Sequence, residues 1–480
     1  SKFEKIGELE ISCEPERITL NVGESKDISL ALSSSFNLKN NKQASGEVNK
    51  TIENETIASL AGNTVTGNAI GKTMLNATYE GIIGTLNTQI QKFNKNVEVE
   101  VLPRNGKVTP KVEAGDGFTV ELKADGTVWS HGQNQYGQLG VGDTNSYNEP
   151  QKVKIIKNTI KNEDGSKTEI EDTIKDISVG NYHVLALSET GKVYAWGYGE
   201  KGQLGTGSGY SNEEPVVVKD IYRKQLQDIV KVEAGENVSF AITSKGKVYA
   251  WGNGYSSRAQ LLDLPENAVD ITSKYVLTGD GKVYNISTKE QLSIVGKIVD
   301  LDEGTNHTVM LTNDGKAYAI GDNTYGQLSN GNNVPSETTP VAVRKNSENI
   351  FTGIKEIKAG DKTTVIVTTD GKLYACGMND NNELGIENKE ILDVNTPQEN
   401  KNIENVIFAN IGTNHVVAIK EDGEVDAFGY GKNGELGSRN DKNKKYFSCE
   451  NGTVGVLLSW FTSKTYQLYY RRNRFGPAYC

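Results

Sequence analysis

Residues 190–207 read TGKVYAWGYGEKGQLGTG and contain a turn, a strand and a glycine-rich loop. The Thr-Gly pair at the start is typical of a tight turn, because glycine accepts positive φ. In the strand that follows, 193–197, valine and alanine face one way while tyrosine and tryptophan face the other. A strand with two apolar faces must be buried between neighbouring sheets, so one such unit cannot be stable by itself.

The same arrangement returns six more times, complete or degraded, between Lys107 and Gly437. Its turns recur at spacings of 34 to 65 residues, at 125–126, 190–191, 245–246, 280–281, 314–315, 370–371 and 422–423. Repeats of this length indicate a propeller or an array, in which stacked units bury each other's faces and a closed ring leaves no exposed ends. We therefore predict an all-β fold with a seven-repeat β-propeller at 107–437.

The second repeat carries the most complete motif, which consists of Gly180, His183, Leu187, Trp196-Gly197 and Gly-Gln-Leu-Gly at 202–205. This motif resembles the repeats of the regulator of chromosome condensation family, whose members form seven-bladed β-propellers. The resemblance covers about 107–437 and therefore implies seven blades.

Some repeats depart from the family pattern. The fourth lacks Trp-Gly at 283–287, so we expect a thin or irregular fourth blade. The third reads Ala-Gln-Leu-Leu at 259–262, and the first has Ser-His-Gly at 130–132 in place of Ala-Trp-Gly.

The N-terminal segment, 1–103, has no Gly-Gln-Leu-Gly unit and consists of short alternating strands, which indicate a β-sandwich. Its pieces 16–30, 55–81 and 97–103 resemble, in that order, a bacterial immunoglobulin-like domain of surface adhesins. That resemblance implies a spacer or adhesive module, and we assign no site residue here. An unrelated small sandwich is the alternative.

The C-terminal segment, 438–480, differs from the repeats. From 442 onward it has seven lysine and arginine residues against a single acid, Glu450, and it holds two of the four cysteines. We interpret it as a frameshifted or foreign tail that only partly replaces the closing strand of the last blade. The alternative is a genuine basic tail that binds an acidic surface.

Composition excludes several classes of function. The net charge of −10 argues against non-specific nucleic-acid binding. The four cysteines lack Cys-x-x-Cys spacing, so neither a zinc site nor a disulfide framework is expected. No apolar run approaches the ~20 residues of a membrane span. The chain begins at Ser1 without a signal-peptide pattern, which we interpret as a processed or excised fragment.

The pattern of histidines argues against catalysis. His183, His307 and His415 occupy one repeat position, so we expect them to pack or hydrogen-bond between blades. His131 replaces an aromatic residue of the repeat, which indicates core or loop packing. The aspartates of the turns are spread around the ring and cannot converge on one substrate. We predict no enzyme activity, no metal and no cofactor, since an enzyme would need converging acid, base or metal-binding residues in the central channel.

The loops before the repeat histidines are the best candidates for binding. They gather at one face of a propeller and differ between blades while the frame repeats, as expected of a recognition surface. The alternative is that these loops vary in sequence without any binding function. The candidate residues are Asp116, Phe118, Asn181, Tyr182, Glu236, Asn237, Thr305, Asn306, Asp361, Lys362, Thr413 and Asn414.

A second candidate is the insertion at 154–176, which predicts a protruding hairpin around Gly165 or, alternatively, a solvated loop.

We therefore predict a non-catalytic recognition protein that is secreted or on a bacterial cell surface. Its propeller face would bind a protein or glycan partner, without nucleic acid. The Asn, Lys and Ile bias is typical of a bacterium with an AT-rich genome. The alternative, which the family resemblance implies, is a guanine-nucleotide exchange factor that binds a small GTPase on the same face.

Overall fold

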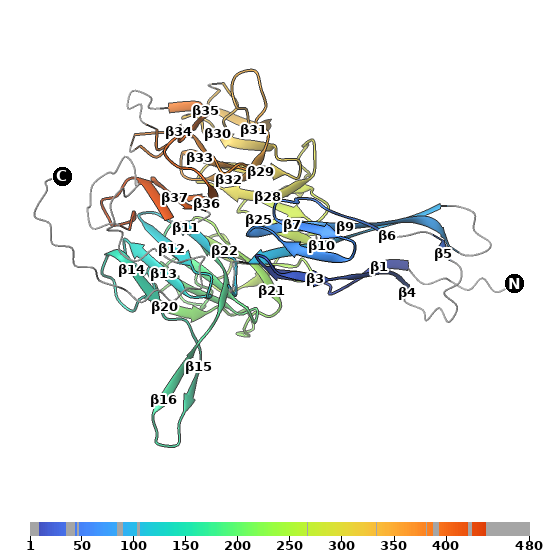
Figure 1. Ribbon diagram of the computed structural model, residues 1–480. Coiled ribbons are helices and arrows are strands. Elements are labelled where there is room, and N and C mark those ends of the chain that lie inside the picture. The colour runs from blue at the N-terminus through green and yellow to red at the C-terminus, as the bar shows by residue number, and fades with distance from the viewer. Residues whose placement is uncertain are drawn as a thin grey trace, which may run out of the picture. The chain divides into compact units, whose positions relative to one another are not determined.

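The computed structural model describes the chain at residues 9–34, 44–45, 48–83, 90–102, 106–265, 267–332, 334–380, 382–386, 393–420 and 425–437. The described secondary structure is entirely β (Figure 1), which confirms the predicted fold class. The chain forms two compact units that divide between Thr109 and Pro110. No helix able to cross a membrane occurs in these described stretches.

The N-terminal unit contains three sheets. Their strands are β1 (Leu9–Glu14) with β4 (Ser29–Ser34); β2 (Ile18–Asn21), β10 (Ile90–Leu102), β9 (Gly71–Ile83), β5 (Ala44–Ser45) and β6 (Val48–Ile52); and β3 (Ser25–Asp27), β8 (Thr64–Gly67) and β7 (Ala58–Ala61). In β10 the valines at 97, 99 and 101 are buried, as period-two alternation requires. They share a core with Ile18, Leu20 and Leu75. The resemblance of this unit to immunoglobulin-like domains stays a prediction.

The second unit is a ring of seven sheets, here called blades. In chain order they are β11 (Lys111–Ala114), β12 (Phe118–Leu122), β13 (Val128–Gly132), β14 (Tyr147–Val153); β17 (Ile174–Val179), β18 (His183–Ser188), β19 (Val193–Gly197), β20 (Asn212–Val217); β21 (Ile229–Ala234), β22 (Val238–Thr243), β23 (Val248–Gly252), β24 (Gln260–Leu261); β25 (Ala268–Ile271), β26 (Tyr275–Thr278), β27 (Val283–Asn285); β28 (Ile298–Glu303), β29 (His307–Thr312), β30 (Ala317–Asp322), β31 (Ser336–Ala342); β32 (Ile354–Ala359), β33 (Thr363–Thr368), β34 (Leu373–Met378), β35 (Asp393–Glu399); and β36 (Val406–Ile411), β37 (His415–Lys420), β38 (Val425–Gly429).

The ring closes through its inner strands. Each blade's first strand lies beside the first strand of the next blade, and β36 of the seventh blade returns to β11 of the first. The seven-bladed propeller is therefore confirmed. The fourth blade has three strands, as expected of its degraded repeat. The seventh has three strands among the described residues, and the tail at 438–480 lies outside them.

The repeated tryptophan and Gly-Gln-Leu-Gly loop join one blade to the next. Trp196 Nε1 of blade 2 donates to the Gln138 carbonyl of blade 1 at 3.0 Å, and Trp251 of blade 3 donates to the Gln203 carbonyl of blade 2 at 2.8 Å. Gly140, the last residue of this loop in blade 1, has φ of +69°, and a Cβ there would come within 2.6 Å of the Trp196 indole nitrogen. The glycine of the motif is thus required by both backbone conformation and space.

The repeat histidines make a second bond between blades. Ser239 Oγ of blade 3 donates to the Gln203 carbonyl of blade 2 at 2.8 Å, so its hydrogen is already used. Ser239 must therefore accept the proton of His183 Nε2, which lies 2.9 Å away. His183 thus carries a proton on Nε2, and the predicted role between blades is confirmed.

The same relay of histidine, hydroxyl and carbonyl recurs at two further junctions. His307 donates to Thr364 at 2.8 Å between blades 5 and 6, and Thr364 donates to the Gln327 carbonyl. His415 of blade 7 donates to Thr119 of blade 1 at 3.0 Å, and Thr119 donates to the Glu435 carbonyl. Burial lowers the pKa of His183 to about 3, of His307 to about 4 and of His415 to about 3.

The closing junction between blades 7 and 1 replaces tryptophan with His131. Its Nδ1 lies 3.1 Å from the Gly434 carbonyl, which confirms the predicted packing role. Glu121 on the neighbouring strand occupies the position of Ala186 in blade 2. Its Oε1 lies 3.3 Å from His131 Nε2. The smaller imidazole ring thus leaves room for a buried carboxylate.

We expect the free energy of unfolding to fall as pH decreases from about 6.5 to 4. In this window the unfolded chain binds protons that the buried neutral histidines exclude, so acid favours unfolding by about 1.4 kcal/mol per pH unit for each histidine. His183→Gln keeps a donor for Ser239 but cannot titrate. Urea unfolding at several pH values should therefore give this variant a pH slope that is shallower by about that amount. Equal slopes would contradict the assignment of His183 as a buried neutral imidazole.

Candidate functional site

The two ends of the ring carry different connections. Because each blade is an antiparallel meander, the loops between first and second strands lie at the same end as the Gly-Gln-Leu-Gly loops. We call this end the loop face. The Asp-Gly turns and the connections between blades lie at the opposite end, here called the turn face. The predicted binding residues belong to the loop face.

A ring of charged side chains lines the channel, in two layers of seven positions. Along the first strand of each blade, successive side chains point to opposite faces, so residues two apart both face the channel. The layer nearer the turn face consists of Lys111, Asp176, Lys231, Asp270, Asp300, Glu356 and Phe408. The layer nearer the loop face consists of Glu113, Ser178, Glu233, Thr272, Asp302, Lys358 and Asn410.

Each lysine of these layers lies among carboxylates. Lys111 Nζ is 2.8 Å from Glu113 and 3.2 Å from Asp176. Burial alone would lower the pKa of Lys111, but these two carboxylates more than offset it and the pKa is raised. Lys231 pairs with Asp270, and Lys358 lies 3.5 Å from both Asp300 and Asp302.

The carboxylates of the layers outnumber the lysines by seven to three. Burial raises the pKa of Asp302 to about 6 and that of Glu356 to about 7, although Lys358 opposes both shifts. The expectation that acid and base residues do not converge in the channel is therefore wrong. The signal was the alternation of charged and apolar residues at 111–113, 231–233, 300–302 and 356–358. We find no group of metal-binding side chains in the described part of the chain.

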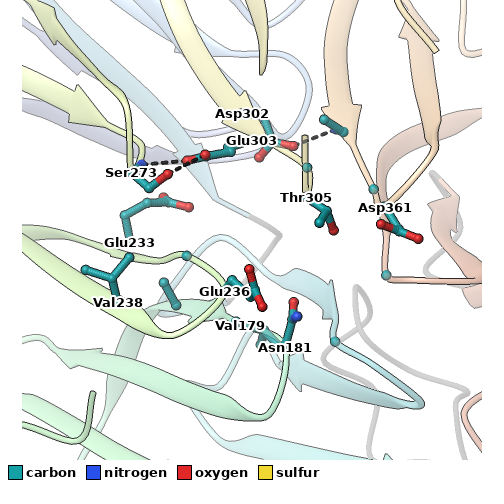
Figure 2. Close-up of a pocket in the computed structure, with 18 of the residues that line it drawn as sticks. Val179, Asn181, Glu233, Glu236, Val238, Ser273, Asp302, Glu303, Thr305 and Asp361 are labelled. Carbon is teal, nitrogen blue, oxygen red and sulfur yellow. Dashed lines mark hydrogen bonds between the residues drawn. The ribbon is translucent and has the colours of Figure 1, made fainter. Parts of the chain in front are cut away.

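A cavity of about 410 Å³ opens where the channel meets the loop face. Figure 2 shows the side chains of Glu233, Glu236, Asn181, Thr305 and Asp361 around this space. Seven predicted residues line the cavity: Asn181, Glu236, Asn237, Thr305, Asn306, Asp361 and Thr413. The first-to-second loops of five blades thus meet at one concave site.

The other predicted residues lie elsewhere. Asp116, Tyr182, Lys362 and Asn414 are not among those that line the cavity, and Lys362 Nζ lies 5.1 Å from the centre of the Tyr325 ring. Phe118 is 0% exposed and pairs with Gly132 as His183 pairs with Gly197. It occupies the histidine position of blade 1 and belongs to the core, so it cannot contribute to a surface.

Sequence reasoning missed the blade 4 loop, Ser273 and Lys274, which also lines the cavity. Tyr275 of blade 4 pairs with Asn285 as Leu185 of blade 2 pairs with Ala195, so the second strand of blade 4 begins two positions later and no histidine marks its loop. Ser273 binds the carboxylate of Glu303, another lining residue that was missed, through both its backbone N–H and its hydroxyl.

Three tyrosines form a cluster on the loop face at the junction of blades 1 and 2. The ring centre of Tyr136 lies 5.2 Å from that of Tyr182 and 4.9 Å from that of Tyr198. The Tyr182 hydroxyl donates to Asp116, and the Tyr198 hydroxyl donates to Glu200 at 2.9 Å. Tyr136 and Tyr198 were missed because they lie in loops assigned to the frame. We call these three residues the tyrosine cluster.

At the tyrosine cluster, a buried glutamine amide lacks a hydrogen bond to the next blade. In blade 2 the Gln203 amide donates to Asn237 of blade 3 at 3.2 Å. The equivalent Gln138 of blade 1 faces Tyr182, where blade 3 has Asn237, and its buried Nε2 has no acceptor. Both glutamines use Oε1 in the same way, to accept a backbone N–H two residues earlier, so their side chains are oriented alike. With Tyr182 at this position, Gln138 Nε2 lacks both the acceptor that Asn237 gives Gln203 and the one that Asp322 gives Gln327, at a cost in stability.

Comparison with known proteins agrees with this geometry. The RCC1-like domain matches residues 76–456. The ultraviolet-B receptor UVR8 of Arabidopsis thaliana is 29% identical over 338 residues, which are 69% of this chain and 68% of the receptor. The human E3 ubiquitin-protein ligase HERC2 is 28% identical over 329 residues, which are 67% of this chain but 6% of the ligase.

Among solved structures, Prp20p of Saccharomyces cerevisiae has the same propeller fold. It superposes with a TM-score of 0.53 at 21% identity over 66% of this chain and 83% of Prp20p. With the family match covering most of the chain, the conclusion is that this protein belongs to the RCC1-like domain family.

Proposed function

We propose that this protein is a non-catalytic recognition protein, secreted or on a bacterial cell surface, whose loop face binds a protein or glycan partner. One observation carries the proposal. Tyr182 leaves the buried amide of Gln138 without an acceptor and places an aromatic ring at the surface. Local rules of folding are broken mainly at functional sites, and tyrosine is enriched among residues that dominate binding energy.

The surroundings of Tyr182 support recognition. The tyrosine cluster adjoins the cavity through Asn181, which precedes Tyr182 and lines the cavity. Concave sites on loops held by a rigid frame are the usual places for ligand binding. The ultraviolet-B receptor is named as a receptor, and the structure of Prp20p was described with its binding to Gsp1p and histones. Recognition of protein partners is therefore compatible with this fold.

The lysines of the channel are suited to holding charge in place and are not activated as bases or nucleophiles. Lys111, Lys231 and Lys358 are each held among carboxylates, and the pKa of each is raised, since those carboxylates more than offset burial. A lysine that acts as a base or nucleophile needs a lowered pKa. The bacterial and extracellular assignment is supported by the composition and by the N-terminal resemblance to adhesin domains.

We expect Tyr182→Ala to reduce partner capture by about tenfold or more, because truncating a central aromatic residue at an interface costs about 2 kcal/mol. The measurement is capture by immobilised protein from host-cell and bacterial-envelope extracts, quantified against wild type. Tyr222→Ala is the matched control, because Tyr222 is 75% exposed and lies in a connection on the turn face. Equal capture by all three proteins would reject Tyr182 as part of the binding surface, and with it the observation that carries the proposal.

A second candidate function is exchange of guanine nucleotide on a small GTPase. The observation in its favour is the predicted hairpin, which consists of β15 (Ile156–Lys161) and β16 (Lys167–Glu171) and protrudes from the propeller (Figure 1). Ile160 and Ile170 lie on one side of it and are 46% and 38% exposed. The hairpin connects β14 to β17 and therefore leaves the turn face.

The exchange candidate predicts that the wild-type protein accelerates release of a fluorescent guanine nucleotide from a purified small GTPase. Replacing both apolar residues, Ile160→Thr with Ile170→Thr, should abolish most of that acceleration, because the apolar side of the hairpin is lost. Thr159→Asn alters the other side and serves as the control. Absence of acceleration by the wild-type protein across a panel of GTPases would reject exchange and leave recognition by the loop face intact.

A further inference from the structure

The chain's own cations neutralise only part of the negative charge in the channel. Seven carboxylates of the two layers face three lysines. The lysine of the layer nearer the loop face is Lys358, whereas Lys111 and Lys231 belong to the layer below. Each layer therefore has two more carboxylates than lysines, and the layer nearer the loop face borders the cavity.

Carboxylates also outnumber cations among the residues that line the cavity, although Glu113 and Asp302 are paired with Lys111 and Lys358 of the channel. The described residues that line it include six carboxylates and one cation, Lys274; the carboxylates are Glu113, Glu233, Glu236, Asp302, Glu303 and Asp361. At the rim, Glu236 accepts a long bond of 3.4 Å from Asn237, and Asp361 lies 3.8 Å from Lys362. Figure 2 shows that these two carboxylates come from different blades and flank the same space. Both therefore add negative charge to the rim of the cavity.

The deeper carboxylates are crowded as well as buried. Burial raises the pKa of Glu303 and that of Glu233, and at Glu233 the charge of Lys231 opposes the shift while that of Asp270 adds to it. Burying several anions together is costly unless cations share the site. The channel shows how that cost is offset, because Lys231 and Lys358 are held there as ammonium groups by Asp270, Asp300 and Asp302.

The tyrosine cluster extends the site beyond a single cation. Its rings are half-buried beside the cavity, and two of its hydroxyls are held by carboxylates, Asp116 and Glu200. Tyrosine ring faces attract lysine and arginine, and the carboxylates add to the attraction. Cavity and cluster together form a continuous surface suited to several residues of an extended basic segment.

We propose that the loop face binds a protein segment with lysine or arginine side chains, one of which enters the cavity between Glu236 and Asp361. This inference rests on the proposed recognition function and names the chemistry of its partner. A neutral glycan could donate hydroxyl hydrogen bonds to the carboxylates of the cavity but brings no positive charge, so the charge favours a basic protein segment.

The test is fluorescence anisotropy of a labelled tetra-arginine peptide with the full chain at about 50 mM salt, where screening is modest. We expect saturable binding that weakens about tenfold in Glu236→Gln with Asp361→Asn. The matched control is Glu163→Gln with Asp164→Asn, which removes the same charge from the exposed turn of the hairpin and should bind as wild type. Labelled tetraglutamate and a neutral tetrasaccharide should not bind.

Three results would overturn the inference: no binding of tetra-arginine, equal weakening by both double variants, or preferential binding of the tetrasaccharide. The second would mean that net charge alone attracts the peptide. Capture of the partner by the two variants distinguishes the recognition proposal from the proposal of a basic segment. If Tyr182→Ala abolishes its capture while the Glu236 and Asp361 double variant retains it, recognition stands and the basic segment is rejected.

Discussion

The structure depends on a relay of hydrogen bonds that joins neighbouring blades near the loop face. A histidine of one blade donates to a serine or threonine of the next, and that hydroxyl donates back to the carbonyl of the glutamine loop, or of Glu435 at the closing junction. Three junctions have the complete relay among the described residues, and one of them, His415 with Thr119, closes the ring. Because each relay starts at the end of a first-to-second loop, it fixes the base of that loop.

A frame held in this way leaves the loop tips free to differ. Asn181 and Tyr182 of blade 2 correspond to Glu236 and Asn237 of blade 3, yet both pairs precede strands with the same register. The inner strands are equally constrained, so their inward side chains form layers in which lysines and carboxylates meet. The cavity, its negative charge and the tyrosine cluster are all consequences of different side chains placed on one repeated backbone.

The period of the repeats was enough to predict the ring, the thin fourth blade and the role of the histidines, because these features follow from local pattern and repetition. It also placed Asn181, Glu236 and Asp361 at one face. The charged channel was missed, since Lys231 and Asp270 lie on different blades and meet only when the register of both inner strands is known. Phe118 was misassigned because blade 1 presents it at the histidine position.

The central claim is that Tyr182 serves recognition at the expense of the frame, and the thermal unfolding midpoint of Tyr182→Asn tests it most directly. Asparagine would give the Gln138 amide the acceptor that Asn237 gives Gln203. Tyr182→Ala is the reference, because it loses the same aromatic contact and the same hydrogen bond to Asp116 without restoring that acceptor. Satisfying a buried donor gains about 1–3 kcal/mol. The account predicts a midpoint for Tyr182→Asn that is a few degrees above that of Tyr182→Ala. Equal midpoints would show that the Gln138 amide gains nothing from an acceptor at 182 and would contradict the account.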